Sequence, residues 1–416
     1  MVIVRSARPV QLIVAAFLAS VLIGTLLLML PIARTGAPGW PSAPGVPEFN
    51  PDSFGPALPG GAPLSVALFT ASSAGSVTGL IVVDTATYWS TFGQVVLLCL
   101  MQLGGLGTMT LASLIALAMA RRLGMRQKNI LLASTGQMHP GQVKETIQRI
   151  VLWALSFQAV GAVVMALHLY SLGEPMKRAV GHGIFLAISA FDNAGFAPYT
   201  DSLISHAGDP FIILPVSALI IIGGLGFPIL IELRRRLLLP RRWTLTTRLT
   251  IAGTLTLILG GWLAIALAEW GNVHTIGQVD TVHKLLASFF AAVSPRTAGF
   301  NSMDIAAQHD ITWMITDMLM FIGGGPAGTA GGIKVTTLLV ILALVRAEVR
   351  AERSASAFGR RIEADVPRQA LTIVVLSGFA VVLVATVIMA FEPWGLDQAG
   401  YEAISAFATV GLSTGI

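Results

Sequence analysis

Four short segments of this chain repeat one pattern of residue types, and each segment ends just after a glycine. In every copy an aromatic residue precedes the glycine by ten positions, an alanine by eight and a small residue by five, and a large apolar residue follows it. The four glycines are Gly79, Gly195, Gly299 and Gly411. Repeats of this kind indicate copies of one structural unit packed around a shared axis.

Long apolar runs flank these segments. Hydrophobic residues make up 54% of the chain and charged residues only 11%, against about a quarter charged residues in an ordinary soluble domain. We expect spanning helices at about residues 10–33, 92–120, 145–170, 211–239, 247–270, 312–345 and 369–391. The repeated segments themselves predict half-helices of about ten residues, too short to cross a bilayer.

Each half-helix leads into an extended stretch of chain. Extended backbone at membrane depth persists only where protein buries it or where it lines a water-filled cavity. Four such stretches indicate a central pore. The predicted fold class is therefore an all-α polytopic membrane protein with four repeats, each a helix, a pore loop and a second helix (M1–pore-loop–M2).

The repeats divide the chain into four units. We assign residues 1–120, 121–239 and 240–350 to the first three repeats and residues 351–416 to the fourth. The fourth copy stops soon after its glycine, without a second helix. From the repeat alone we expect the native chain, or its ordered part, to continue by one more helix.

The basic residues predict the topology. Twenty of the 26 Lys and Arg residues fall in four clusters. These are Arg5 with Arg8, and the segments 121–149, 234–248 and 346–368. Short loops rich in Lys and Arg stay in the cytoplasm, which places the N-terminus and three loops inside. Long apolar runs separate the clusters, whereas a nucleic-acid site needs one contiguous basic surface, so we expect no nucleic-acid partner.

The residues that end each half-helix are the candidate cation ligands. A ring of backbone carbonyls from four loops replaces the water shell of a cation without fixed charge, and glycine permits the backbone angles that turn carbonyls inward. The half-helices also aim their partly negative C-terminal ends at the centre. The candidate ligands are Val77, Thr78, Gly79, Asn193, Ala194, Gly195, Thr297, Ala298, Gly299, Thr409, Val410 and Gly411.

The second helices carry glycine runs at 102–109, 221–228 and 320–328. Such runs permit either close helix packing or a break in the helix. The third run continues as a segment that cannot hold a regular helix, because it combines Pro326 with many glycines. Those glycines are Gly323, Gly324, Gly325, Gly328, Gly331 and Gly332. Lys334 is an ionisable residue in an apolar span and so a functional candidate, although it could also lie at the inner surface and snorkel.

Three single residues carry further expectations. Asp192 and Arg296 each lie three positions before a repeat glycine. We expect them to pair across neighbouring loops and brace the pore, since a lone buried charge is costly; attraction of cations by Asp192 is the alternative. Cys99 is the one cysteine, which excludes a multi-cysteine metal site, and its apolar neighbours predict a buried thiol.

Two rival classes of protein remain. The sequence GLSTG at 411–415 fits the G-x-S-x-G elbow of serine hydrolases, with Ser413 as nucleophile, but the motif needs a strand–turn–helix that the sequence does not predict. An ion-coupled secondary carrier is the second rival. Such carriers usually show two inverted repeats with helices broken at the midplane, whereas four same-direction repeats favour a pore.

The pattern resembles the Trk/Ktr/HKT superfamily of potassium transporters over essentially the whole chain. Its most specific pieces are SVTGLIVVDT, AISAFDNAGFA, SPRTAGFNSMD, AISAFATVGLSTG and MFIGGGPAGTAGGIKVTT. The short N-terminus looks most like the KtrB-type pore subunits of bacterial Ktr systems. The missing last helix is the one visible departure from the family pattern.

The resemblance implies several properties as expectations. It implies K⁺ uptake across a bacterial plasma membrane through a pore inside each protomer, with Gly79, Gly195, Gly299 and Gly411 in the selectivity filter. It implies a gate formed by the loop from Gly323 to Lys334. It implies a homodimer in the membrane lipid and a cytosolic, nucleotide-binding KtrA-type ring. K⁺ is the expected ion at the filter, with Na⁺ as a candidate coupling or activating ion and no covalent cofactor.

Overall fold

The computed structural model describes residues 9–36, 56–122, 143–352, 354–363 and 365–415. The expectations for Arg5 and Arg8, and for Arg126 and Lys128 of the second basic cluster, lie outside these residues. Helices dominate the described part of the chain, and its named strands are a two-residue hairpin, β1 (Ser356–Ala357) with β2 (Arg360–Arg361). The chain is an all-α polytopic membrane protein.

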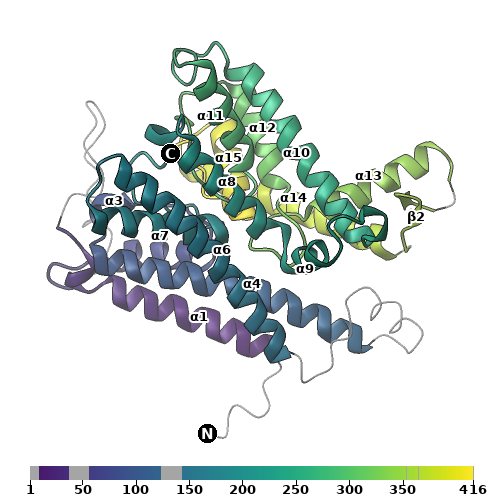
Figure 1. Ribbon diagram of the computed structural model, residues 1–416, viewed down its shortest axis with the longest axis horizontal. Helices are drawn as coiled ribbons and strands as arrows, with labels where there is room; N and C mark the ends of the chain where they lie inside the picture. Colours follow the sequence, from purple (N-terminus) through teal and green to yellow (C-terminus); the bar gives the residue numbers. More distant parts are fainter. Residues whose placement is uncertain (1–8, 37–55, 123–142, 353, 364, 416) are drawn as a thin grey trace, which may run out of the picture.

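Five long helices form the frame. They are α1 (Pro9–Leu28), α4 (Thr91–Arg122), α6 (Val143–Ser171), α10 (Leu245–Glu269) and α14 (Asp365–Phe391). Within the described residues α4, α6, α10 and α14 contain windows long and apolar enough to cross a membrane. Figure 1 shows α1, α4 and α10 running in roughly the same diagonal direction. Their outward faces carry many exposed apolar side chains, as expected where lipid replaces water as the surrounding medium.

Four shorter helices fill the inside of this frame. They are α2 (Leu64–Gly75), α7 (Met176–Asp192), α11 (Thr281–Val293) and α15 (Leu396–Ala408). Each packs on the long helix that precedes it in the chain, α2 on α1, α7 on α6, α11 on α10 and α15 on α14. Their ends nearest the repeat glycines are buried, including Ala74, Ala190 and Ala408. A small side chain at these sites lets the four helix ends approach one another closely.

The second helices differ among the repeats. In the first repeat α4 is continuous. In the second, the expectation of one helix over 211–239 is wrong, because α8 (Pro210–Leu225) and α9 (Phe227–Arg236) meet at an angle of 101°. Gly226 forms the break with a φ of +93°, a conformation that glycine adopts without steric cost. In the third repeat, the glycine-rich loop separates α12 (Asp310–Phe321) from α13 (Val335–Val349).

The glycine runs of the second helices also serve close packing. A Cβ added to Gly104 would lie under 3.0 Å from the carbonyl oxygen of Gly75, at the end of α2. A Cβ on Gly105 would meet the Asp192 carboxyl group, and one on Gly223 would meet the Phe191 carbonyl oxygen. The glycines at 102–109 therefore permit close helix packing in a continuous helix. Those at 221–228 permit close packing and are followed by the break between α8 and α9.

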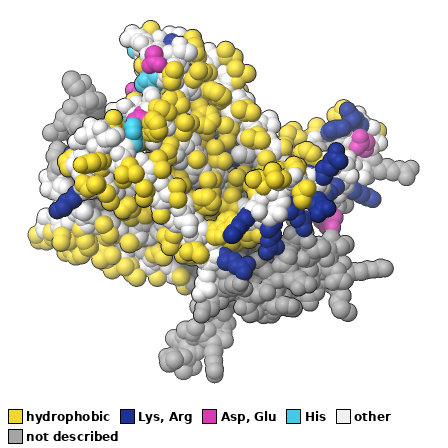
Figure 2. Space-filling model, viewed as in Figure 1, with side chains coloured by type: hydrophobic (Ala, Val, Ile, Leu, Met, Phe, Trp, Pro, Cys, Tyr) yellow, Lys and Arg dark blue, Asp and Glu magenta, His cyan; other side chains and the backbone are white. Residues whose placement is uncertain are grey.

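The two ends of the molecule differ in charge. In Figure 2, most of the visible Lys and Arg side chains gather at the end formed by α9, α13 and the hairpin, while His side chains lie at the opposite end. Apolar side chains cover the face between them. Cys99 of α4 is exposed, so the expectation of a buried thiol is wrong. An apolar neighbourhood in the sequence of a membrane helix is as compatible with a lipid-facing side chain as with a buried one.

Shorter elements complete the described chain. They are η2 (Pro31–Ala33), α3 (Thr85–Tyr88), η5 (Ile204–His206) and η6 (Pro240–Arg242). Asp84 caps α3 through its bond to the Ala86 amide and also accepts a hydrogen bond from Thr200 Oγ1 at 2.8 Å. Asn301 joins the third loop to the second, because its amide donates to Ser202 Oγ at 3.0 Å. These links hold successive loops side by side beyond the repeat glycines.

Candidate functional site

The four loops adopt one backbone conformation. In each, the residue two positions before the repeat glycine is in the left-handed region, and so is the glycine itself. The non-glycine residues are Val77 (φ 57°), Asn193 (φ 59°), Thr297 (φ 76°) and Thr409 (φ 54°), and the glycines have φ values of 87°, 74°, 76° and 96° in chain order. Non-glycine residues rarely adopt this region. Four equivalent occurrences therefore mark one repeated structural feature.

The four glycines close a ring in chain order. A Cβ added to any of them would lie under 3.0 Å from the carbonyl oxygen that precedes the glycine of a neighbouring loop. Gly79 meets the Ala194 oxygen, Gly195 the Ala298 oxygen, Gly299 the Val410 oxygen, and Gly411 the Thr78 oxygen. Since the last contact returns to the first loop, the loops surround one axis. A side chain at any of these positions would collide with backbone.

Serine residues anchor each loop to the end of its half-helix. In every loop the amide of the residue before the glycine donates to a serine carbonyl oxygen. The bonds run from Thr78 to Ser73, from Ala194 to Ser189, from Ala298 to Ser294 and from Val410 to Ser405, at 2.8 to 2.9 Å. Sequence reasoning missed these serines as a set, because the third one stands a position closer to its glycine than the other three.

Two of the serine side chains hold the chain beyond the ring as well. Ser189 Oγ donates to the Phe196 carbonyl oxygen at 2.7 Å, and Ser294 Oγ donates to the Phe300 carbonyl oxygen at 2.6 Å. Each hydroxyl therefore binds the residue just after its repeat glycine. These internal partners satisfy carbonyls of the residues that follow the ring. The backbone carbonyls of the four loops remain the predicted cation ligands, as neutral oxygens without fixed charge.

Asp192 and Arg296 do not pair, so the predicted ion pair is wrong. The Asp192 carboxylate is fully buried and accepts a hydrogen bond from Gln158 Nε2 of α6 at 3.3 Å. Arg296 Nη2 instead donates to Thr254 Oγ1 at 3.3 Å and to the Gly323 carbonyl oxygen at 3.4 Å. The two side chains lean outward from their own loops toward different helices. Each supports its loop separately.

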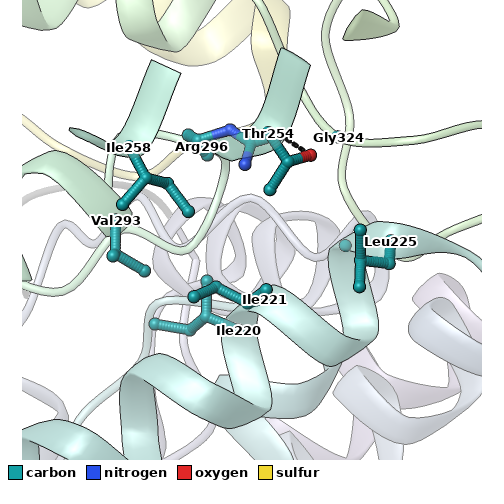
Figure 3. Close-up of a pocket in the computed structure, with 9 residues that line it drawn as sticks. Ile220, Ile221, Leu225, Thr254, Ile258, Val293, Arg296 and Gly324 are labelled. Carbon is teal, nitrogen blue, oxygen red and sulfur yellow. Dashed lines mark hydrogen bonds between the residues drawn. The ribbon is translucent and has the colours of Figure 1, made fainter. Parts of the chain in front are cut away.

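Arg296 lies beside a small cavity behind the third loop. Figure 3 shows its side chain extending toward Thr254 of α10, with Ile220 and Ile221 of α8 on the opposite side of the cavity. Its bond to Gly323 connects the third loop to the glycine-rich segment that follows α12. The residue therefore links the ring to the predicted gate loop.

The glycine-rich segment from Gly323 to Lys334 is a non-helical loop with a turn at 326–327, and its two ends lie side by side because the Gly323 amide donates to the Ile333 carbonyl oxygen at 2.8 Å. It is fastened to the end of α8 by backbone bonds from Gly325 to Gly224 at 2.7 Å and from Thr329 to Gly223 at 3.1 Å. Thr329 Oγ1 also donates to the Phe191 carbonyl oxygen at 3.1 Å. A Cβ on Gly223 would meet both the Phe191 carbonyl oxygen and Thr329 Oγ1 at under 3.0 Å, so this glycine of the second run permits the contact between α7, α8 and the loop.

The same segment touches the ring itself. The Gly331 amide donates to Thr297 Oγ1 at 3.2 Å, and a Cβ on Gly331 would collide with Thr409 Oγ1. Lys334 Nζ donates to the Ala330 carbonyl oxygen at 2.5 Å and to the Gly331 carbonyl oxygen at 3.4 Å. Lys334 thus folds back onto its own loop. The loop lies directly under two of the four predicted filter segments.

Ser413 has no hydrolase geometry in the described structure. It lies in the extended stretch after Gly411, and its hydroxyl donates to Glu402 Oε1 at 2.9 Å. The same carboxylate oxygen accepts the Thr414 amide at 2.7 Å. A nucleophile elbow needs a histidine partner and a strand–turn–helix, whereas here a carboxylate orders an extended chain. Glu402, which sequence reasoning missed, fixes the fourth loop beyond the ring.

Four half-helices whose loops close a ring inside a frame of apolar helices define a multi-pass membrane protein of the pore-loop class. The family described as "TrkH: Cation transport protein" matches residues 60–416. The chain belongs to this family. Its members are transport proteins, and the hydrolase alternative is thereby set aside.

Similar proteins cover most of the chain. The Ktr system potassium uptake protein B of Bacillus subtilis (strain 168) is 36% identical over 411 residues, which cover 98% of this chain and 86% of that protein. The protein of the same name from Vibrio alginolyticus is 36% identical over 359 residues, covering 86% of this chain and 78% of that protein. The Potassium/sodium uptake protein NtpJ of Enterococcus hirae is 31% identical, covering 99% and 87%.

A solved structure shares the fold. The crystal structure of the potassium transporter TrkH from Vibrio parahaemolyticus aligns with a TM-score of 0.64 at 20% sequence identity. The alignment covers 96% of this chain and 77% of that chain. At this level of identity the likeness supports the helical architecture, and the family assignment comes from the sequence matches.

Proposed function

We propose that this chain is the K⁺-conducting pore subunit of a Ktr-type uptake system. The ring of four equivalent loops carries the proposal, because eight backbone positions repeat the same left-handed conformation around one axis. Carbonyl oxygens of such a ring match the ligand needs of a dehydrated K⁺ ion. The names of the relatives, two potassium uptake proteins and one potassium/sodium uptake protein, agree with this ion.

The glycine-rich loop is the proposed gate. It lies under the third and fourth loops and is held by hydrogen bonds to the end of α8, to the Phe191 carbonyl oxygen and to Thr297. Because the segment lacks helical structure, its opening breaks these separate bonds and no helical ladder. Lys334 bonds to carbonyls of the loop and stabilises its present form. Movement of this loop would expose the lower side of the ring.

Regulation is proposed to come from a partner protein. The name "Ktr system" given to two relatives implies more than one component. The basic end of the molecule offers a surface for a cytosolic, nucleotide-binding ring of the KtrA type, and the assembly would be a homodimer in the plasma membrane with its N-terminus inside. Na⁺ is proposed as a coupling or activating ion because one relative is named for both ions.

The test is ⁸⁶Rb⁺ and K⁺ uptake into a bacterium deficient in potassium uptake, comparing the full-length chain with Gly299→Ser. Gly299 has a φ of +76°, and a Cβ there would collide with the Val410 carbonyl oxygen. We expect the wild type to prefer K⁺ over Na⁺ and the variant to lose about tenfold or more of that preference. Gly107→Ser is the matched control, since a Cβ on Gly107 has nothing within 4 Å.

The controls separate the proposal from its rivals. Equal amounts of both variants in the membrane exclude misfolding as the cause of lost selectivity. Uptake that appears only on co-expression of a regulatory ring supports the proposed partner. Uptake that saturates, requires an imposed Na⁺ gradient and keeps its selectivity in Gly299→Ser would contradict the pore and support an ion-coupled carrier.

A further inference from the structure

A groove at the basic end of the molecule is separate from the ring and the gate loop. It lies between α6 and α9 and has a volume of about 460 Å³. Trp153 and Phe157 of α6 form one wall, and Leu230 and Leu233 of α9 line the other together with Leu237, which directly follows α9. The Trp153 ring packs edge-on against Phe227, with 5.9 Å between centroids, so the aromatic wall is fixed by the start of α9 as well. The volume lies in the range of ligand pockets.

The groove is apolar inside and cationic at its edge. Ser156 lines it, but its hydroxyl already donates to the Leu152 carbonyl oxygen of the same helix at 2.6 Å. The guanidinium carbon of Arg234 lies 5.1 Å from the Trp153 ring centroid, and the Arg234 side chain remains exposed. A ligand for this groove therefore needs a long apolar part and an anionic group at one end.

The orientation of α9 places the groove at the membrane surface. Since α9 turns by 101° from α8, a spanning α8 leaves α9 running along the interface. Three arginines end α9, and three exposed leucines follow, with Leu238 exposed to 90%. Arginines beside exposed apolar side chains are typical of a helix that lies in the interface. The basic cluster assigns this interface to the cytoplasmic leaflet.

The positive charge at the groove has no acidic partner in the part of the chain that the structure describes. The salt bridges there join His168 to Asp209 and His182 to Glu174, and neither reaches α9. Glu232 is the acidic residue of α9, but its carboxylate accepts hydrogen bonds from Thr244 and Thr247 at the start of α10. The arginine side chains are therefore available to an anion that comes from outside the described chain.

We infer that the groove between α6 and α9 binds an anionic phospholipid of the cytoplasmic leaflet. An acyl chain lies against Trp153 and Phe157, and the phosphate contacts Arg234 with its arginine neighbours. Basic pockets between membrane helices on this side bind anionic headgroups. A zwitterionic lipid fills the same apolar groove but lacks the net charge that the arginines select. A lipid in this groove contacts α9. It therefore lies next to the α8–α9 junction, where the gate loop is hydrogen-bonded to α8.

The experiment uses Trp153 as a built-in reporter. The purified full-length chain in detergent is titrated with phosphatidylglycerol or phosphatidylcholine carrying the same brominated acyl chains, and tryptophan quenching is recorded. The Trp153→Phe variant keeps an aromatic wall, and subtracting its signal isolates the quenching of Trp153. We expect half-maximal quenching of Trp153 at about fivefold less phosphatidylglycerol than phosphatidylcholine.

Two charge variants decide whether the groove is specific. Arg234→Gln is expected to reduce the fivefold preference to about onefold, because it removes the cation at the groove edge. Arg361→Gln, in the hairpin at the same end of the molecule, is expected to leave the preference unchanged. Equal quenching by both lipids in the wild type, or an equal loss in both variants, would overturn the inference. So would a Trp153 that neither lipid quenches, which is the result if a second copy or another chain segment fills the groove.

Discussion

At the scale of single residues, the ring depends on the absence of side chains at four positions and on unusual backbone angles at four more. Val77, Thr297 and Thr409 are β-branched and have positive φ, a conformation that costs each on the order of 1–2 kcal/mol. The serine anchors and the contacts between neighbouring loops must offset that cost. Strain of this kind persists only where the surrounding structure determines it.

Asp192 offers a prediction at this scale. Its fully buried carboxylate has Gln158 as its hydrogen-bond partner and no cationic partner among the described residues. Since an unpaired buried charge is costly, Asp192→Asn should leave the melting temperature of the purified protein unchanged or raise it. K⁺ uptake and its selectivity should change by less than about twofold, because the side chain lies behind its loop.

Ion uptake at several external K⁺ concentrations checks this prediction. Gln158→Leu serves as the comparison, since it leaves Asp192 without its partner and should lower the melting temperature. A large rise in the KM for K⁺ in Asp192→Asn, with the melting temperature unchanged, would instead assign Asp192 to the attraction of cations.

At the scale of elements, the breaks in the second helices set the position of the gate loop. Gly226 ends α8 where the loop residue Ala327 accepts a hydrogen bond from the Phe227 amide, and a Cβ on Gly226 would meet the Pro326 carbonyl oxygen. The bend between α8 and α9 in the second repeat therefore packs directly against the glycine-rich loop of the third. Neither element can be straightened without displacing the other.

A second prediction concerns the fastening of the loop. Thr329→Val keeps the size of the side chain but removes the bond from Oγ1 to the Phe191 carbonyl oxygen. Loss of a buried hydrogen bond costs about 1 kcal/mol, so the present conformation of the loop should be less populated. We expect faster K⁺ uptake at unchanged K⁺ over Na⁺ selectivity.

Flux into proteoliposomes measures this effect without other cell components. Thr372→Val is the control, because the Thr372 hydroxyl bonds only to Arg368 of its own helix on an exposed surface. Unchanged flux in Thr329→Val, or a change that Thr372→Val reproduces, would show that this bond does not hold the gate.

Much of the architecture could be predicted from the sequence, because four copies of one pattern constrain each other. The half-helices and the glycines that end them align in every copy, so the prediction of four pore loops did not depend on similarity at a single site. The bend at Gly226 was not predicted, since a glycine in an apolar run is compatible with a straight helix. The hydrogen-bond partners of Asp192 and Arg296 could not be predicted either, because they come from α6 and α10, which lie far away in the sequence.

At the scale of the whole molecule, the uneven distribution of charge predicts its orientation. The end with α9 and the hairpin is basic, and the opposite end carries histidines and the acidic caps of the outer loops. The positive-inside rule predicts that the basic end lies in the cytoplasm. The same orientation would put the proposed gate loop on the cytoplasmic side of the ring.

Cysteine labelling in intact cells tests the orientation. In a Cys99→Ser background, Val273→Cys lies in the exposed loop after α10 and Arg360→Cys lies in the hairpin. A membrane-impermeant maleimide should label the cysteine at 273 in intact cells and the one at 360 only after the membrane is opened. The reverse pattern would invert the topology and place the proposed lipid groove in the outer leaflet.

The closed order of the ring has a consequence for how the protein is made. Each glycine rests against a carbonyl of another repeat, and the final contact joins Gly411 to Thr78. A ribosome delivers these two residues at opposite ends of synthesis. We expect the first loop to lack this contact until the fourth repeat has been inserted. With the ring as the proposed selectivity filter, a chain arrested before its fourth repeat would hold most of the helical frame but would not discriminate K⁺ from Na⁺.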